Sequence, residues 1–357
     1  MWYEKQFRDS GNLTTLLQAI RQIATFPIRI MEVCGGQTYA LSRYRIEELL
    51  PDTVQMIHGP GCPVCVTHED TISQAIEIAR NPQTIFCTFG DMVRVPGTKG
   101  SLQQLKAEGK DIRIVYSPLD TLRIASENPE KQVVFFAIGF ETTTPLYTLL
   151  LQEIVSRKIT NLSLLTSLFT IPAAISFLAQ DPECKIDGLL AAGHVCSITG
   201  LREYDALELP IAVTGFEPAD LLYGIYQVIR LKAQGIDRTI NAYRRAVPAQ
   251  GNKMARQKTE RFFTPYDAYW RGLGKIPVSG LRLRPEYEQY EARNRFLCKV
   301  KPGIQASACR AGEIMKGKIS PEKCPLFGNH CTPDTPLGAS MVSSEGACSA
   351  FYRYRTN

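Results

Sequence analysis

Short apolar runs alternate with helical patterns along the first two thirds of the chain. Each run has the length of a buried strand, and most are followed by a segment with the apolar spacing of a helix. The expected strands span residues 28–33, 54–57, 84–89, 112–116, 133–138, 162–168, 189–192 and 211–214. The expected helices span residues 39–50, 69–80, 102–108, 145–158, 172–180 and 218–234. This alternation predicts an α/β fold built on doubly wound parallel sheets.

The alternation restarts after a gap and ends near residue 239. We therefore expect two tandem α/β domains, residues 1–117 and 118–238, followed by a mainly helical and loop region, residues 239–357. Composition changes at the second boundary: residues 239–357 hold 20 Lys and Arg against 9 Asp and Glu, whereas residues 1–238 hold 21 against 26. The overall net charge of +6 is mild. With no aromatic-rich RNA-binding motif beside the basic residues, nucleic acid is not an expected partner.

The N-terminus is polar, and the longest apolar run, residues 133–140, is far shorter than the roughly 20 residues of a membrane-spanning helix. We expect no membrane span and a cytoplasmic location. Cysteines stay reduced in that compartment, so clustered cysteines indicate metal or redox sites more than structural disulfides. The chain has eleven cysteines, an odd number that does not suit a fully paired disulfide framework.

Cys62 and Cys65 form a Cys-Pro-Val-Cys pair between an expected strand and an expected helix. The spacing brings two sulfurs within bonding reach near a helix N-terminus, whose positive dipole end lowers the pKa of a thiol. Incidental cysteines in a buried turn are the structural alternative. The strand–turn–helix setting favours metal ligation or thiol–disulfide exchange.

Cys34 has the same placement, because Cys34-Gly35-Gly36 follows the first expected strand. Ligands of an open parallel sheet bind beyond the carboxyl ends of its strands. We therefore expect Cys34, Cys62 and Cys65 to converge on one cleft. Cys196 follows a later strand, and it either faces the same cleft or packs in the core.

Glu141, Thr142 and Thr143 follow the expected strand 133–138. They either line the cleft as proton carriers and hydrogen-bond donors or cap the helix that begins there. Three of the four histidines lie beside cysteines in the sequence, where each could tune a thiolate. These histidines are His58, His68 and His194.

Four further cysteines are spaced along the last fifty residues, at Cys309, Cys324, Cys331 and Cys348. Four thiolates suit zinc or an iron–sulfur cluster. The long gaps between them differ from the two short knuckles of a zinc ribbon, which favours the cluster. The segment 307–348 has little apolar content, so a metal is the expected way to stabilise it.

Together these motifs resemble the hydrogenase maturation factor HypD family. The resemblance is carried by residues 34–36, 59–65, 90–97 and 139–143 and by the four C-terminal cysteines. It implies a [4Fe-4S] cluster and a role in assembling the Fe(CN)2CO group of [NiFe]-hydrogenases. It also implies two partners, a HypC-type small chaperone and a HypE-type cyanide donor. The chain has Gln37 and Tyr39 where many members of that family have histidine.

The resemblance implies a role for each cysteine motif. Cys34 would hold the nascent iron of the Fe(CN)2CO group, and Cys62 and Cys65 would form a redox-active dithiol. The four C-terminal cysteines would bind the cluster that passes electrons. This describes an assembly scaffold rather than a conventional turnover enzyme. The alternative functions are a stand-alone, cluster-dependent thiol–disulfide oxidoreductase acting on a protein substrate and a zinc-stabilised binding module.

Overall fold

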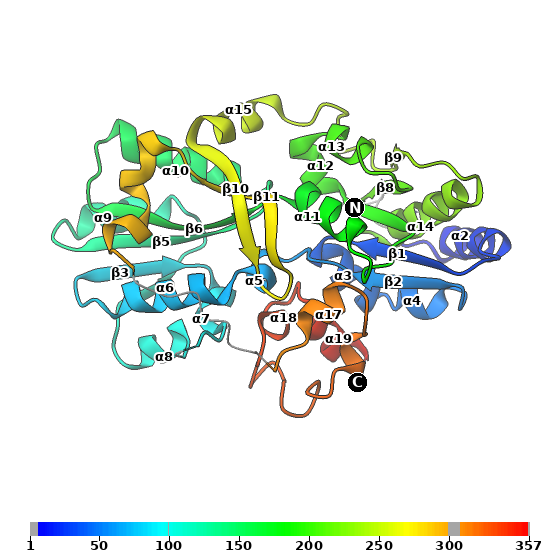
Figure 1. The fold of residues 1–357 in the computed structure, drawn as a ribbon, viewed down its shortest axis with the longest axis horizontal. Coiled ribbons are helices and arrows are strands. Elements are labelled where there is room, and N and C mark those ends of the chain that lie inside the picture. Colours follow the sequence, from blue (N-terminus) through cyan, green and yellow to red (C-terminus); the bar gives the residue numbers. More distant parts are fainter. Residues whose placement is uncertain (1–5, 99, 299–307, 356–357) are drawn as a thin grey trace.

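The structure is a computed structural model, and it describes residues 6–98, 100–298 and 308–355. Its strands form one sheet of five and one of six, both mainly parallel and flanked by helices (Figure 1). This confirms the α/β class with two parallel-dominated sheets. All eight strands expected from the sequence are present within one to two residues of their expected ends.

The five-stranded sheet has the order β2-β1-β7-β8-β9, and every neighbouring pair is parallel. Its strands are β1 (Ile28–Glu32), β2 (Val54–His58), β7 (Gly188–Ala192), β8 (Ile211–Thr214) and β9 (Thr239–Asn241). In the register of β1 with β2, Glu32 lies opposite His58 at the carboxyl ends of both strands. The first residues after β1, β2 and β7 therefore lie next to one another along one edge of the sheet.

The six-stranded sheet has the order β10-β11-β6-β5-β3-β4. Its strands are β3 (Thr84–Thr88), β4 (Ile112–Ile114), β5 (Gln132–Gly139), β6 (Leu162–Phe169), β10 (Phe263–Trp270) and β11 (Gly274–Leu283). The expectation that strands end near residue 239 is wrong, because β10 and β11 form an antiparallel hairpin that pairs with β6. Buried and exposed positions are mixed along this hairpin, so it lacks the continuous apolar run of the inner strands.

The two sheets are interleaved along the chain. The chain leaves the five-stranded sheet after β2, builds β3 to β6 of the other sheet, and returns at β7. The boundary expected near residue 117 does not coincide with the division between the sheets, because β3 and β5 pair across it. Apolar periodicity identifies the inner strands but carries no information about which sheet a strand joins.

The expected helix 39–50 is two helices, separated at Arg45, which has a φ of 51°. The helices are α2 (Ser10–Ile23), α3 (Gly35–Arg43), α4 (Ile46–Leu49), α5 (Pro63–Val66), α6 (Glu69–Arg80), α7 (Gly90–Arg94), α8 (Leu102–Ala107), α9 (Asp120–Glu127), α10 (Thr144–Ser156), α11 (Ile171–Gln180), α12 (Gly193–Thr199), α13 (Arg202–Asp205), α14 (Pro218–Ala233), α15 (Lys253–Phe262), α16 (Ala292–Arg295), α17 (Ala311–Met315), α18 (Ala339–Val342) and α19 (Ala347–Arg355), with 3-10 turns η1 (Pro285–Tyr290) and η2 (Pro321–Lys323). Among the described residues, no helix combines the length and apolar character needed to cross a bilayer.

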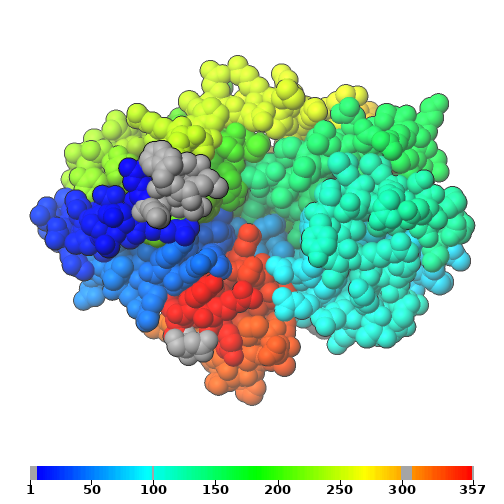
Figure 2. Space-filling model, turned by 180° about the vertical axis from the view of Figure 1, so that it is seen from behind, coloured from blue at the N-terminus to red at the C-terminus, as the bar shows by residue number. Residues whose placement is uncertain are grey.

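The C-terminal segment, residues 308–355, consists of loops and short helices, as expected. In Figure 2 it lies as an orange and red body between the blue N-terminal part and the cyan part of the chain. Helix α19 packs against α3, and α18 packs against α5. The helices that follow β1 and β2 are therefore both covered by the end of the chain.

Candidate functional site

Cys34 is the N-cap of α3, directly beyond the carboxyl end of β1. Its Sγ accepts a hydrogen bond from the Gly36 N–H at 3.3 Å, and its own N–H donates to Glu32 Oε2 at 2.9 Å. The side chain is 5% exposed, and burial raises the pKa of the Cys34 thiol well above its ordinary value. A cation bound to the sulfur would offset that cost, because metal ligation favours the thiolate.

The Cys62–Cys65 loop lies against the Cys34 turn, as the strand order requires. Cys62 is the N-cap of α5, and the two cysteines are joined by a disulfide. The Gly35 N–H donates to the Gly61 carbonyl at 3.0 Å. A Cβ at Gly61 would lie 2.2 Å from the Cys34 backbone nitrogen, so only glycine permits this approach. The expected convergence of the two motifs takes the form of direct packing.

His194 contacts Cys34, from α12 beyond the end of β7. Its Nε2 and Nδ1 lie 3.7 and 3.9 Å from Cys34 Sγ, and its ring stacks on Phe216 with centroids 5.1 Å apart. Burial lowers the pKa of His194, so the ring is neutral at pH 7. The sequence paired His194 with its neighbour Cys196, whereas the structure places the ring against Cys34, 160 residues away in the sequence.

Cys196 faces the core and not Cys34. It is completely buried, and its thiol lies beside the hydroxyl of Tyr204. Burial raises the pKa of Cys196 to about 12. Of the two alternatives that the sequence left open for Cys196, the structure supports core packing.

Glu141 lies beyond the end of β5, in the other sheet. Its Oε1 accepts a hydrogen bond from the Ile171 N–H at 2.8 Å, whereas Oε2 is buried and accepts none from the described residues. Burial raises the pKa of Glu141 to about 8, so the carboxyl group is mainly protonated at neutral pH. Thr143 donates to the Phe140 carbonyl at 3.1 Å, which stabilises its own turn, and Thr142 is half-buried.

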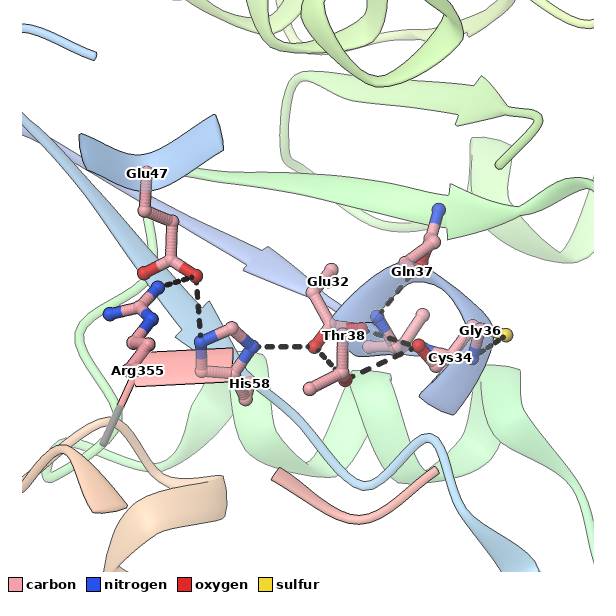
Figure 3. A network of polar contacts seen from close by, with 9 residues as sticks. Glu32, Cys34, Gly36, Gln37, Thr38, Glu47, His58 and Arg355 are labelled. Atoms are coloured by element: carbon pink, nitrogen blue, oxygen red, sulfur yellow. Dashed lines mark hydrogen bonds and ion pairs between the residues drawn. The ribbon is translucent and has the colours of Figure 1, made fainter. Parts of the chain in front are cut away.

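The two histidines that flank the cysteine pair in the sequence interact with carboxylates. His58 places Nδ1 2.8 Å from Glu32 Oε1 and Nε2 3.2 Å from Glu47 Oε1 (Figure 3). His68 Nδ1 lies 3.3 Å from Asp70 Oδ2. Both ring nitrogens of His58 are thus engaged, so His58 does not tune Cys62 in the way the sequence suggested.

Gln37 and Tyr39, both on α3, make buried or interhelical contacts. Gln37 is fully buried, and its Nε2 donates to Thr214 Oγ1 at 2.7 Å. The Tyr39 hydroxyl accepts a hydrogen bond at 3.0 Å from Tyr354, on α19. Gln37 therefore links α3 to β8, and Tyr39 links α3 to the C-terminal helix.

Of the four C-terminal cysteines, Cys331 and Cys348 lie in the small core of the C-terminal segment, and Cys309 and Cys324 are half-buried. Burial, followed by the charges of the other three thiolates, raises the pKa of Cys348, so all four interact electrostatically. Cys331 Sγ accepts the Leu337 N–H at 3.4 Å, and a Cβ at Gly338 would lie 2.3 Å from Cys309 Sγ. No three metal-ligating side chains form a preassembled ion site within residues 6–98, 100–298 and 308–355. Four interacting thiols with an amide donor nonetheless fit the ligand chemistry of an iron–sulfur cluster.

Comparison with known proteins gives consistent matches along nearly the whole chain. The family model "HypD: Hydrogenase formation hypA family" matches residues 12–355. The hydrogenase maturation factor HypD of Escherichia coli K12 is 43% identical over 367 residues, covering 99% of this chain and 98% of that protein. The proteins of the same name from Rhodobacter capsulatus and Rhizobium leguminosarum bv. viciae are 42% and 43% identical, over 99% of this chain and 98% and 96% of their own lengths.

Proposed function

Because the chain belongs to the hydrogenase maturation factor HypD family, we propose that it serves as the scaffold on which the Fe(CN)2CO group of [NiFe]-hydrogenases is assembled. Cys34 is the proposed ligand of the iron, which is the cargo of the protein. The observation that carries the proposal is the surroundings of the Cys34 sulfur. It meets a neutral histidine at 3.7 Å and a backbone N–H at 3.3 Å, next to a cysteine pair.

These surroundings suit the loading of iron onto a buried thiol. When Cys34 binds iron, its S–H bond breaks, a S–Fe bond forms, and one proton must leave. His194 Nε2 is near enough to receive that proton, because the neutral ring has a free lone pair on one nitrogen. A soft thiolate is a suitable ligand for iron that also carries cyanide and carbon monoxide.

Glu141 is the proposed proton donor on the facing sheet, since its carboxyl group keeps a proton up to about pH 8. Thr142 and Thr143 are proposed as further hydroxyl groups of the same turn. This assignment follows from the buried, unpaired Oε2 of Glu141. A buried acid without an ionic partner is the kind of group that can release a proton when a neighbouring charge changes.

The Cys62–Cys65 disulfide is the proposed two-electron store. Its reduction consumes two electrons and two protons, breaks the S–S bond, and yields two thiols. Cys309, Cys324, Cys331 and Cys348 would hold a [4Fe-4S] cluster, which supplies or accepts single electrons when bound. In support, Cys65 Sγ lies 3.9 Å from the Ala339 carbonyl, so the segment that carries these cysteines lies against the disulfide.

The proposed partners are a HypC-type small chaperone, which would share the iron, and a HypE-type protein, which would supply cyanide, in the cytoplasm. Both would have to deliver ligands to Cys34, a residue that is 5% exposed. Partner binding is therefore expected to open the contact between the Cys34 turn and the C-terminal segment.

The proposal is tested by hydrogenase maturation in cells that depend on this chain. Cys34→Ala should abolish maturation, because no other side chain replaces the sulfur. Cys298→Ala is the matched control, since Cys298 lies outside all three cysteine sites and should support normal maturation. Full maturation by the Cys34→Ala variant, at an equal protein level, would remove Cys34 from the mechanism.

A stand-alone thiol–disulfide oxidoreductase is the second candidate, favoured by the disulfide at the start of α5. Against it, Cys62 and Cys65 are each 4% exposed, so a protein substrate does not reach them without an opening of the loop. Reduction of a disulfide-bonded test protein separates the two. With dithionite as the electron donor, rapid turnover by the purified chain supports the oxidoreductase, and a rate no higher than that of dithionite alone supports the scaffold.

A further inference from the structure

Four charged side chains form a continuous array from the last turn of α19 to the end of β1 (Figure 3). An Arg355 guanidinium nitrogen lies 2.6 Å from Glu47 Oε1, and the same oxygen lies 3.2 Å from His58 Nε2. His58 Nδ1 lies 2.8 Å from Glu32 Oε1. The four groups come from α19, α4, β2 and β1, and cations and carboxylates alternate along the array.

The array is electrically balanced, buried at its Glu32 and His58 end and partly exposed at its Glu47 and Arg355 end. Glu32 is completely buried, and His58 is 5% exposed. Burial alone would lower the pKa of His58, but the carboxylates of Glu47 and Glu32 raise it to about 10, so the ring is an imidazolium at neutral pH. Burial would raise the pKa of Glu47, but His58 and Arg355 hold it below its ordinary value. Removing one member of such a set leaves an uncompensated buried charge, which is far costlier than loss of an exposed ion pair.

One end of the array holds the turn that carries Cys34. Glu32 Oε2 accepts the Cys34 N–H at 2.9 Å. Glu32 Oε1, which faces His58, also accepts a hydrogen bond from the Thr38 hydroxyl, one turn further along α3. Glu32 thus binds both the N-cap residue and the first turn of α3. Its orientation fixes where the Cys34 side chain begins.

The other end of the array belongs to the segment of the four C-terminal cysteines. Arg355 and Phe351 lie one turn apart on α19, with the guanidinium 3.9 Å from the ring centroid. The Phe351 ring meets His58 edge to face, with centroids 5.0 Å apart. The same helix carries Cys348 near its start. A displacement of α19 would therefore disturb His58 in two ways, through the Phe351 ring and through the Arg355–Glu47 ion pair.

We propose that His58 is a positioning residue for Cys34. Through the array of Arg355, Glu47, His58 and Glu32, the position of the Cys34 sulfur depends on how α19 packs against the rest of the chain. The array holds the Cys34 turn closed against His194. The relevance of this array to iron loading rests on the proposed function. The positioning of Cys34 does not, because it concerns only the reactivity of the Cys34 thiol. A purely structural role would stabilise the whole protein without a specific effect at Cys34.

The test measures the alkylation rate of individual cysteines by iodoacetamide in the purified full-length chain, with mass spectrometry of the peptides. His58→Gln removes the imidazolium and leaves Glu32 and Glu47 facing an uncharged amide. The turn should open more often, and Cys34 should react at least about tenfold faster, which corresponds to about 1.4 kcal/mol in the opening equilibrium. Cys87, buried in β3, reports global unfolding in the same sample and should not change.

Each variant has a matched control. His68→Gln makes the same substitution at a histidine outside the array, and Arg353→Ala removes an exposed arginine from the same helix as Arg355→Ala. We expect Cys34 to react faster in His58→Gln and Arg355→Ala, and within about twofold of the unmodified chain in both controls. Glu32→Gln combined with His58→Gln removes one negative and one positive charge. This double variant should restore slow alkylation, because the amide oxygen of the new side chain at position 32 still accepts the Cys34 N–H.

The outcomes are decisive in either direction. A Cys34 rate in His58→Gln equal to that in His68→Gln overturns the positioning role. Equal rates in Arg355→Ala and Arg353→Ala overturn the link to α19. Unfolding of His58→Gln would be seen as Cys87 reacting as fast as Cys34, and the Glu32→Gln, His58→Gln double variant then decides. If that double variant is folded and its Cys34 is still alkylated fast, the proposal is contradicted. Because no hydrogenase is needed, a positive result stands even if the proposed scaffold function fails.

Discussion

Replacement of Gly61 by alanine should force apart the two loops that carry Cys34 and the cysteine pair. The added Cβ would lie 2.2 Å from the Cys34 nitrogen and 2.4 Å from its Cα. Carbon atoms in contact stay about 3.5–4.0 Å apart, so one backbone must move by more than about 1 Å. Both obstructing atoms belong to the backbone, and no side-chain rotation can relieve the overlap.

The expected cost has two parts. Overpacking of a well-packed site costs about 1–3 kcal/mol, and the absence of a movable side chain places Gly61→Ala at the upper end. Separation of the loops also weakens the hydrogen bond from the Gly35 N–H to the Gly61 carbonyl, worth about 1 kcal/mol. The free energy of unfolding should therefore fall by about 3–4 kcal/mol.

The assay is urea unfolding followed by circular dichroism, with the midpoint compared between variants. Gly90→Ala is the matched control, because the nearest atom to its added Cβ is 4.0 Å away and Gly90 begins helix α7. Alanine there should be neutral or stabilising by up to about 1 kcal/mol. Equal midpoints for Gly61→Ala and Gly90→Ala would show that the two loops do not pack as described.

Three further perturbations probe other parts of the account. The folded-state pKa of Glu141 is raised to about 8, so its contribution to the free energy of unfolding should be full at low pH. That contribution should fall as pH rises from about 4.5 to 8, by at most about 1.4 kcal/mol per pH unit. A Glu141→Gln variant whose free energy of unfolding, measured in urea, keeps the same dependence on pH would refute this assignment. Cys331→Ser should lower the iron content of anaerobically purified protein from about four atoms per chain, and metal analysis that finds zinc in the unmodified chain would contradict the cluster. Gln37→Leu should cost about 1–3 kcal/mol in urea unfolding, because the Thr214 hydroxyl loses its buried donor, and an unchanged midpoint would argue against that contact.

The strands and the cysteine motifs could be predicted from sequence because their signals are local. The strand Leu162–Phe169, in which five of eight residues are Leu or Phe, is buried at every position, and its high apolar content indicates that burial. The hairpin of β10 and β11 has exposed residues such as Tyr269 and Val278 and contains Pro265, so its pattern is not that of an inner strand. It forms because it pairs with the edge of β6.

The partners of Cys34 could not be derived in the same way, because they depend on strand order. His194 reaches Cys34 only because β7 pairs with β1, although the two strands are far apart along the chain. The array of Glu32, His58, Glu47 and Arg355 has one local signal, a glutamate at the buried carboxyl end of β1. A buried carboxylate there calls for a cation. The sequence does not reveal that this cation is His58, held in turn by the far end of the chain.

The infrared spectrum of the chain, purified anaerobically with its HypC-type and HypE-type partners, tests the central claim most directly. Cyanide and carbon monoxide bound to iron give stretching bands in a region where protein groups do not absorb. We expect both kinds of band in the unmodified chain and in the Cys298→Ala control, and neither in Cys34→Ala. Unaltered bands in Cys34→Ala, or their absence from the unmodified complex, would contradict the assignment of Cys34 as the ligand on which the Fe(CN)2CO group is assembled.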